Sequence, residues 1–307
     1  MTRSTRLLLQ KTPETDNMKI MTLNTHSLAE PDYESKLTAF AGSLVQIQPD
    51  IIALQEVSQS RNASPAAPDR LPDWGYVPCS TGDIAQDSPS GPRTVIRADN
   101  HAFNLALLLA QSGLSYEWTW VPAKIGYGKY DEGLAVLSRS PILGTHQFYI
   151  TGSRDYGNWK TRKILGISTR TEHGTEYFYS VHMGWWNDSE EPFEGQWKRI
   201  CSGLAPLSGE QVWLMGDFNS PAHVAGQGHD LVLASGWFDS YDLAASRDGG
   251  ITVEHAIDGW REHGEISGMR IDYIWTSRRV PVISSRTIFN GASYPIVSDH
   301  FGIITEY

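Results

Sequence analysis

Short apolar runs that end abruptly in a polar or charged residue recur along the chain, and this feature most constrains its fold. The strand-like runs are Lys19 to Leu23, Ile51 to Leu54, Ala106 to Ala110, Leu134 to Leu137, Ile164 to Arg170, Glu176 to His182, Gln211 to Met215, Met269 to Trp275 and Gly302 to Tyr307. Helical spacing of apolar residues is found in Glu34 to Ile47, Phe193 to Leu204 and Asp230 to Ala234. Many strands with few helices, without regular alternation of the two, predict packed sheets with helices outside.

The organisation of the chain indicates one domain. Residues 60 to 100 are rich in Pro, Ser, Asp and Gly and predict a long loop, a kind of segment that is often functional. No internal repeat or linker is evident, so we expect a single domain over residues 18–307. Residues 1–17 are expected to be a disordered extension or a remnant of expression.

The charge and the cysteines limit the partners that we expect. The chain has 25 Lys and Arg against 35 Asp and Glu, and the resulting net charge of −10 disfavours nucleic acid, although a local basic cleft stays compatible with it. Cys79 and Cys201 lack a metal-ligand spacing. Neither a signal peptide nor a membrane span is evident, so a cytoplasmic protein is expected. Nothing in the sequence indicates the oligomeric state.

Polar side chains gather where the predicted strands end. Asn24 follows the first strand, Glu56 follows the second, and His182 ends another. Asp217 and Asn219 follow a further strand and are two residues apart, so in an extended chain both would face one way. A turn is the competing interpretation of this segment, since Gly, Asp and Asn all favour turns.

The remaining polar candidates complete a set of oxygen and imidazole groups. Asp272 interrupts an apolar strand and therefore needs a partner, and Asp299 stands beside His300. Oxygen ligands without cysteine favour Mg²⁺ or Mn²⁺ over structural zinc. Such an ion neutralises phosphate oxygens, and a histidine paired with a carboxylate transfers protons. These residues together predict metal-assisted hydrolysis of a phosphate ester.

The same segments, in order, resemble the motifs of the endonuclease/exonuclease/phosphatase superfamily. They are Thr22-Leu23-Asn24-Thr25-His26, Leu54-Gln55-Glu56-Val57, Gly133-Leu134-Ala135-Val136-Leu137-Ser138, Ser180-Val181-His182, Gly216-Asp217-Phe218-Asn219, Arg270-Ile271-Asp272-Tyr273-Ile274 and Ser298-Asp299-His300. The resemblance runs from about residue 19 to the end of the chain. It implies a four-layer α/β sandwich like that of deoxyribonuclease I, in which two mixed sheets pack face to face between helices, and it implies that residues 18–307 form one catalytic domain.

The resemblance also implies where the metal and the attacking water lie. Asn24 and Glu56 would bind the metal directly, with Asp299 close to the ion. Asp217 and Asn219 would position the attacking water and the phosphate.

A second implication of the resemblance concerns the two histidines. Asp272 would orient His300, and Glu132 would orient His182, so that the histidines act as a pair of acid and base. Tyr130 stands where the deoxyribonuclease I branch has a tyrosine that faces the phosphate. A plain turn is the alternative for Tyr130 and Glu132.

The fold does not decide the substrate, because it hosts many activities. Trp185 and Trp186 follow His182 closely and would stack on a sugar, insert into a membrane or fill the core. Their surroundings and three other segments are similar to bacterial maltose 6'-phosphate phosphatases of this superfamily: Lys124 to Gly133, Asp155 to Lys163 and Ile257 to Arg261.

Basic residues in these segments are the candidates for binding phosphate. Lys160, Arg162, Lys163 and Arg261 would supply the cations, and an Arg fork suits phosphate geometrically. Solvated surface charge is the alternative for each of them. We therefore predict a metal-dependent phosphatase for a small phosphorylated substrate, with a sugar phosphate such as maltose 6'-phosphate as the leading candidate.

Two other functions compete with this prediction. A phosphodiesterase of the same fold, either a nuclease or sphingomyelinase-like, is the nearer one. A non-catalytic binding module is the more distant one, because such a module would be expected to have lost metal or histidine positions that this chain retains.

Overall fold

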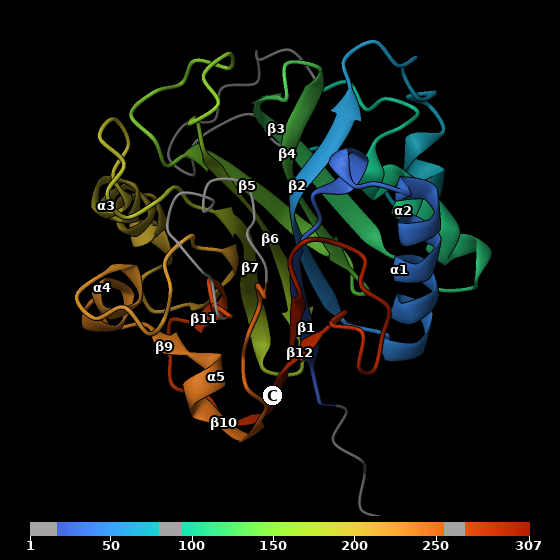
Figure 1. Ribbon diagram of the computed structural model, residues 1–307. Helices are drawn as coiled ribbons and strands as arrows, with labels where there is room; N and C mark the ends of the chain where they lie inside the picture. Colours follow the sequence, from blue (N-terminus) through green and yellow to red (C-terminus); the bar gives the residue numbers. More distant parts are fainter. Residues whose placement is uncertain (1–16, 80–93, 255–267) are drawn as a thin grey trace, which may run out of the picture.

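Two β-sheets pack face to face in the computed structural model, and helices cover the outer face of each sheet (Figure 1). The structure describes residues 17–79, 94–254 and 268–307. Both sheets contain parallel and antiparallel pairs, so the predicted sandwich of two mixed sheets with flanking helices is confirmed.

The first sheet has seven strands in the order β10-β12-β13-β1-β2-β4-β3. Their bounds are β1 Lys19–Asn24, β2 Ile51–Ser60, β3 Glu117–Gly126, β4 Tyr130–Ser138, β10 Ala244–Arg247, β12 Val282–Ile288 and β13 Gly302–Glu306. Strand β1 lies at the centre, parallel to β2 and antiparallel to β13.

The second sheet has six strands in the order β5-β6-β7-β8-β11-β9. Their bounds are β5 Ile142–Tyr149, β6 Lys163–Thr171, β7 Gly174–His182, β8 Gln211–Asp217, β9 Phe238–Asp239 and β11 Asp272–Thr276. Strands β7 and β8 run parallel, and β11 runs antiparallel to β8.

Helices cover each sheet from outside, as Figure 1 shows with α1 and α2 on one side and α3 and α4 on the other. Their bounds are α1 Tyr33–Ile47, α2 His101–Gln111, α3 Phe193–Leu204, α4 Gly228–Ala234 and, between β9 and β10, α5 Ser240–Leu243. Within the described ranges, no helix is long and apolar enough to span a membrane.

Three apolar layers result, because each central strand buries both of its faces. In β8, Val212 and Leu214 pack in the layer under α3 and α4, whereas Trp213 and Met215 pack in the layer between the sheets. Successive side chains of a strand point to opposite faces, so a strand buried on both sides is apolar throughout. The continuous apolar runs in the sequence have this cause.

The predicted strand at Ala106 to Ala110 is wrong, because this run lies inside helix α2. Asn100 caps that helix, and its side chain accepts a hydrogen bond from the backbone N–H of Phe103. A short apolar run fits a buried helix as well as a buried strand, and only the cap upstream distinguishes them. In the described part of the predicted 60–100 loop, β2 continues to Ser60, and a short 3₁₀ helix forms at Leu71–Trp74.

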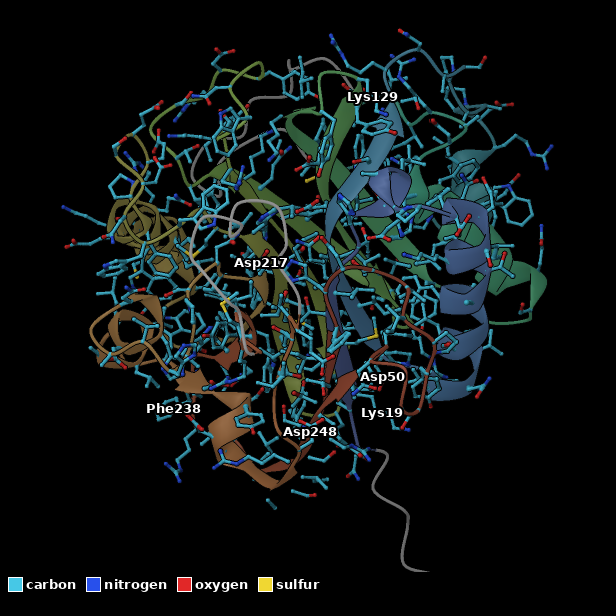
Figure 2. The ribbon with its side chains drawn as sticks, viewed as in Figure 1. Lys19, Asp50, Lys129, Asp217, Phe238 and Asp248 are labelled. Carbon is cyan, nitrogen blue, oxygen red and sulfur yellow. The ribbon has the colours of Figure 1, made fainter. Side chains whose placement is uncertain are left out.

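The starts of the central strands lie at one end of the sandwich, away from the polar residues that follow these strands. Lys19 and Asp50 lie at the starts of β1 and β2, where the Lys19 N–H donates to Asp50 Oδ2 at 2.9 Å. Figure 2 shows both residues at one end of the ribbon and Asp217 deeper inside, between the sheets. The polar residues that follow the strands therefore gather away from the strand starts.

Candidate active site

The candidate site lies where the parallel strand pairs of both sheets end. Asn24 is the last residue of β1, and Glu56 lies beside that end in β2. His182 and Asp272 both pair in register with Asp217, one from each neighbouring strand. Because adjacent strands lie about 4.8 Å apart, this register places the three side chains in one row across the second sheet.

A bulge in β2 directs Glu56 into the site. The register with β4 shifts between Leu54 and Val57, and Glu56 has a φ of 52°, which is unusual for a residue with a side chain. Bulges of this kind re-aim side chains beside active sites. The amide nitrogen of Asn24 donates to Glu56 Oε1 at 3.0 Å and to Asp217 Oδ2 at 3.1 Å, so Asn24 joins carboxylates from the two sheets.

The segment after β8 forms a tight turn. Asp217 Oδ1 accepts a hydrogen bond from the backbone N–H of Asn219 at 2.8 Å, and Asn219 has a φ of 47°. The turn is therefore the correct one of the two interpretations, and Asp217 and Asn219 still line one pocket. Gly216 has a φ of 149°, and a Cβ at this position would lie 2.0 Å from the carbonyl oxygen of Val181. Glycine is needed here for close approach of the strands.

His300 sits in a buried carboxylate pair. Its Nδ1 lies 3.0 Å from Asp272 Oδ2, which is the contact expected from the sequence, and its Nε2 lies 3.9 Å from Asp217 Oδ2. Burial lowers the pKa of His300, but Asp272, Asp217 and Asp299 together raise it to about 10. Burial and the charge of Asp272 raise the pKa of Asp217 to about 7. The site thus combines a charged imidazolium with a carboxyl group that titrates near neutrality.

His182 occupies a different electrostatic environment. Its Nε2 lies 3.6 Å from Asp217 and 4.0 Å from Glu56. Burial, followed by the nearby cations Arg162 and Lys124, lowers its pKa well below the ordinary value. His182 is therefore neutral, whereas His300 is charged, and the two histidines are suited to different steps.

The predicted partner of His182 needs correction. Glu132 Oε1 pairs with Lys124 Nζ at 3.0 Å, whereas the described carboxylates within 4.0 Å of His182 Nε2 are those of Asp217 and Glu56. Lys124 stands opposite Glu132 in the β3–β4 register, so the cross-strand neighbour takes the carboxylate.

Glu56 and Asp299 form the acidic side of the pocket. Burial, followed by the charges of Glu132 and Asp299, raises the pKa of Glu56. Crowded carboxylates of this kind fit a hard divalent cation, which would relieve their repulsion with oxygen ligands. In this structure the amide nitrogen of Asn24 faces Glu56, so direct ligation by its oxygen stays a prediction.

His26 also belongs to the site, although the sequence assigned it no role. Its Nδ1 lies 2.9 Å from Glu30 Oε1 and 4.0 Å from Asp299 Oδ2, and its Nε2 lies 2.9 Å from the hydroxyl of Tyr127. Burial lowers the pKa of His26, but Glu30, Asp299 and Glu56 raise it to about 9. The available signal was its place in the Asn24-Thr25-His26 motif.

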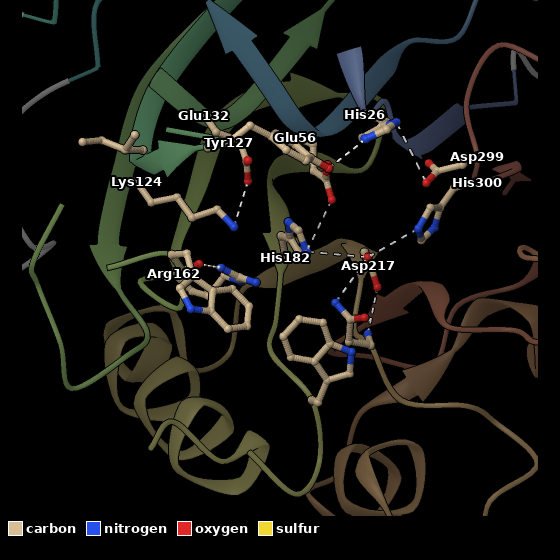
Figure 3. Close-up of a pocket in the computed structure, with 15 residues that line it drawn as sticks. His26, Glu56, Lys124, Tyr127, Glu132, Arg162, His182, Asp217, Asp299 and His300 are labelled. Carbon is tan, nitrogen blue, oxygen red and sulfur yellow. Dashed lines mark hydrogen bonds and ion pairs between the residues drawn. The ribbon is translucent and has the colours of Figure 1, made fainter. Parts of the chain in front are cut away.

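These groups surround a pocket of about 290 Å³. Figure 3 shows Lys124 and Arg162 on one side, His26, Asp299 and His300 on the other, and His182 and Asp217 between them. The complete lining is His26, Glu56, Lys124, Ile125, Gly126, Tyr127, Glu132, Trp159, Arg162, His182, Trp185, Asp217, Asn219, Asp299 and His300. Imidazole, carboxylate and cationic groups thus share one small cavity.

The two neighbouring tryptophans, Trp185 and Trp186, lie in different environments. Trp185 lines the pocket, and its ring centroid lies 5.7 Å from that of Trp159, which also lines it. Trp186 instead packs against Phe193 of α3, with ring centroids 5.8 Å apart, in the layer outside the second sheet. The proposed sugar-stacking role therefore fits Trp185, and core packing describes Trp186.

Of the predicted phosphate-binding cations within the described residues, only Arg162 lines the pocket. Lys160 pairs with Asp188 and Glu190, and Lys163 donates to Gln147 and lies over the Tyr149 ring. Arg261 lies outside the described residues.

Lys124, which the sequence did not single out, supplies a second pocket cation. The signal was available, because Lys124 interrupts an apolar strand as Asp272 does.

Tyr130 is a further correction. Its hydroxyl donates to the carbonyl oxygen of Leu28 at 3.0 Å, and its side chain is buried outside the pocket lining. The turn between β3 and β4 instead presents Tyr127 to the pocket.

A family model for the endonuclease/exonuclease/phosphatase family matches residues 21–300. The chain belongs to this family. Its members are hydrolases that act on phosphate esters, so the chain is a hydrolase of this class. Enzymes of the family generally depend on a divalent metal, and His26, Glu30 and Asp299 form one of the described groups able to hold one.

Solved structures support the family assignment. A family protein from Leptotrichia buccalis C-1013-b has 32% sequence identity and a TM-score of 0.77, and the match covers 94% of this chain and 98% of that one. The mannosyl-6-phosphatase Bt3783 of Bacteroides thetaiotaomicron VPI-5482 has 14% identity and a TM-score of 0.60, with 94% and 98% covered. TDP2 from Caenorhabditis elegans has 14% identity and a TM-score of 0.56, with 94% and 74% covered. Comparison with curated proteins found no match.

Proposed function

We propose that residues 18–307 form one catalytic domain, a Mg²⁺- or Mn²⁺-dependent phosphatase for the monoester of a small sugar. Maltose 6'-phosphate is the leading candidate substrate. One observation carries the proposal: the buried histidines and carboxylates lie in a pocket of about 290 Å³ with aromatic and cationic walls. This volume is at the lower end of the range for small-ligand sites.

The aromatic wall supports a sugar as the non-reacting part of the substrate. Trp159 and Tyr127 are each 53% exposed, so their rings are accessible from the pocket mouth. The indole N–H of Trp185 is buried without a hydrogen-bond partner among the described residues. A sugar offers an apolar ring face for the aromatics and hydroxyl groups for that N–H.

The polar floor supports hydrolysis of a phosphate ester. Asp217, whose pKa of about 7 suits a general base, accepts a proton from the attacking water, and Asn219 helps to hold that water. His300, kept charged by Asp272, donates to a phosphate oxygen. Glu56 and Asp299 would hold the divalent cation, which would supply further positive charge to the phosphate.

A phosphodiesterase of the same fold is the alternative, which the presence of two histidines beside Asp217 favours. The net charge of −10 and the small pocket favour a small substrate over DNA. The mannosyl-6-phosphatase among the structural neighbours has the same fold, which makes a sugar phosphate a natural choice to test. The expected cytoplasmic location stays a prediction, tested by cell fractionation.

Comparative kinetics test the proposal. With one metal, we expect kcat/KM on maltose 6'-phosphate or another sugar phosphate to exceed that on sphingomyelin and on double-stranded DNA. Trp185→Ala should lower sugar-phosphate kcat/KM by about tenfold, the usual scale of lost aromatic contacts, whereas Trp186→Ala should act mainly on stability. A higher kcat/KM on DNA or sphingomyelin would overturn the substrate assignment.

A further inference from the structure

We infer that Arg162, assisted by Lys124, holds the third non-bridging oxygen of the phosphate, which a monoester has and a diester lacks. The inference rests on the proposed function and deepens it. Arg162 would thus be the residue that makes this site a monoesterase.

Arg162 is a buried cation with unused hydrogen-bonding capacity. Its side chain lines the pocket, and the residue is only 4% exposed. One guanidinium nitrogen donates to the carbonyl oxygen of Trp159 at 2.8 Å, but Nε has no hydrogen-bond partner among the described residues. No carboxylate oxygen of those residues lies within 4.0 Å of this guanidinium. A buried charge without a counter-ion is costly, and an anionic ligand would offset this cost.

Lys124 lies on the same side of the pocket as Arg162 (Figure 3). Its ammonium pairs with Glu132 at 3.0 Å. Arg162 has no such ion pair with a described carboxylate, and Glu132, Glu56 and Asp217 act on its charge only from a longer distance. Both cations lie close enough to His182 to lower its pKa. They therefore border the catalytic centre rather than the mouth of the pocket.

The phosphate must fit between two unlike sides. Glu56 and Asp299 are acidic, and a metal that they hold would attract some of the phosphate oxygens. Arg162 faces them across His182 (Figure 3). A monoester carries two negative charges over three non-bridging oxygens, so one oxygen remains for Arg162. A diester places an ester oxygen and its substituent there, leaving the buried guanidinium without an acceptor.

The test compares p-nitrophenyl phosphate with bis(p-nitrophenyl) phosphate, which have the same leaving group. Arg162→Gln should lower kcat/KM on the monoester by about 10²-fold, as expected for loss of one preorganised charged donor, and on the diester by less than about fivefold. Arg162→Lys keeps the charge without the fork and should fall between. The control is Arg247→Gln, an exposed residue paired with Asp242, which should change neither value.

Inhibition by inorganic phosphate gives a readout of binding. The inhibition constant should rise at least about tenfold in Arg162→Gln and less in Arg162→Lys. If the glutamine variant fails to fold, the lysine variant provides the test. A merely structural Arg162, holding the Trp159 carbonyl, would lower both activities equally, and that result would overturn the inference. The wild-type ratio tests the proposed function separately, because a wild-type preference for the diester would overturn the function itself.

Discussion

Two clusters of ionisable groups are each built around a buried aspartate of the second sheet, and they differ in how well their charges match. The Asp217 cluster comprises Asp217, Glu56, Asp272, His182 and His300. The Asp239 cluster comprises Asp239, His229 and Arg270. Each is built around an aspartate that is 2% exposed.

The Asp239 cluster is saturated. Asp239 pairs with Arg270, lies 3.2 Å from His229 Nε2 and accepts the backbone N–H of Tyr241 at 3.0 Å. Burial raises the pKa of Asp239, but His229 and Arg270 lower it overall. In the other cluster, burial and Asp272 raise the pKa of Asp217 to about 7. Matched charges stabilise the fold, whereas the mismatched ones leave binding capacity for a metal and a substrate.

Metal removal should have the largest effect, a loss of the activity that we assign to the Asp217 cluster. The acidic side of the pocket needs a cation, so excess chelator should abolish phosphatase activity, and Mg²⁺ or Mn²⁺ should restore it. Glu56→Gln should greatly weaken the response to metal, because an amide binds a hard cation less well than a carboxylate. Titration of activity with Mg²⁺ measures this, with the exposed Glu190→Gln as control. Full activity in chelator would show that the site works without metal.

Asp239→Ala should have the next largest effect, and on stability alone. It leaves Arg270 buried without its carboxylate, which typically costs about 3–5 kcal/mol of unfolding free energy. Urea unfolding measures the loss, and kcat of the folded protein should stay within a few-fold. Asp242→Ala, which removes an exposed partner of Arg247, should cost less than about 1 kcal/mol. Equal losses in both variants would contradict the contrast between the clusters.

Asp217→Ala and His300→Ala should lower activity rather than stability. Each should lower kcat by at least about 10²-fold, the scale of lost proton transfer or water alignment. Because the buried carboxylate of Asp217 is poorly compensated, its removal should not lower the unfolding free energy near neutral pH. Steady-state kinetics and urea unfolding on the same samples provide both values. Near-normal turnover in a folded variant would show that its role is misassigned.

The smallest expected effect is a dependence of the unfolding free energy on pH, which comes from the titration of Asp217. The folded state holds a proton on Asp217 up to about pH 7, whereas the unfolded state releases it near pH 3.8, so this group makes stability fall as pH rises between these values. Asp217→Asn removes this fall in stability, because the amide does not titrate. In chelator, the unfolding free energy of the variant relative to wild type should therefore rise by roughly 2–3 kcal/mol from pH 5 to pH 8, at about 1.4 kcal/mol per pH unit. A gain that is equal at both pH values would contradict the raised pKa.

Much of the floor of the candidate site could be predicted from the sequence, because it depends on residues at the ends of local strand runs. Asn24, His182 and Asp217 end strands whose apolar runs are visible in the chain. Strand register then brings His182 beside Asp217, and the packing of the two sheets brings Asn24 to them. That Asp272 needs a partner followed from its place in a buried strand, and the family resemblance implied that this partner is His300. The partner of Glu132 could not be predicted from the sequence, because Lys124 becomes its neighbour only through the β3–β4 pairing.

The sequence by itself determined the strands that end at the site, the family and the acidic and imidazole groups, because strand periodicity and residue chemistry are local properties. Only the tertiary structure decided which neighbours enter the pocket. Trp185 faces it and Trp186 packs against α3; Arg162 faces it and Lys160 pairs with Asp188. Adjacent residues in a loop have no fixed periodicity, so their directions follow from packing against distant segments.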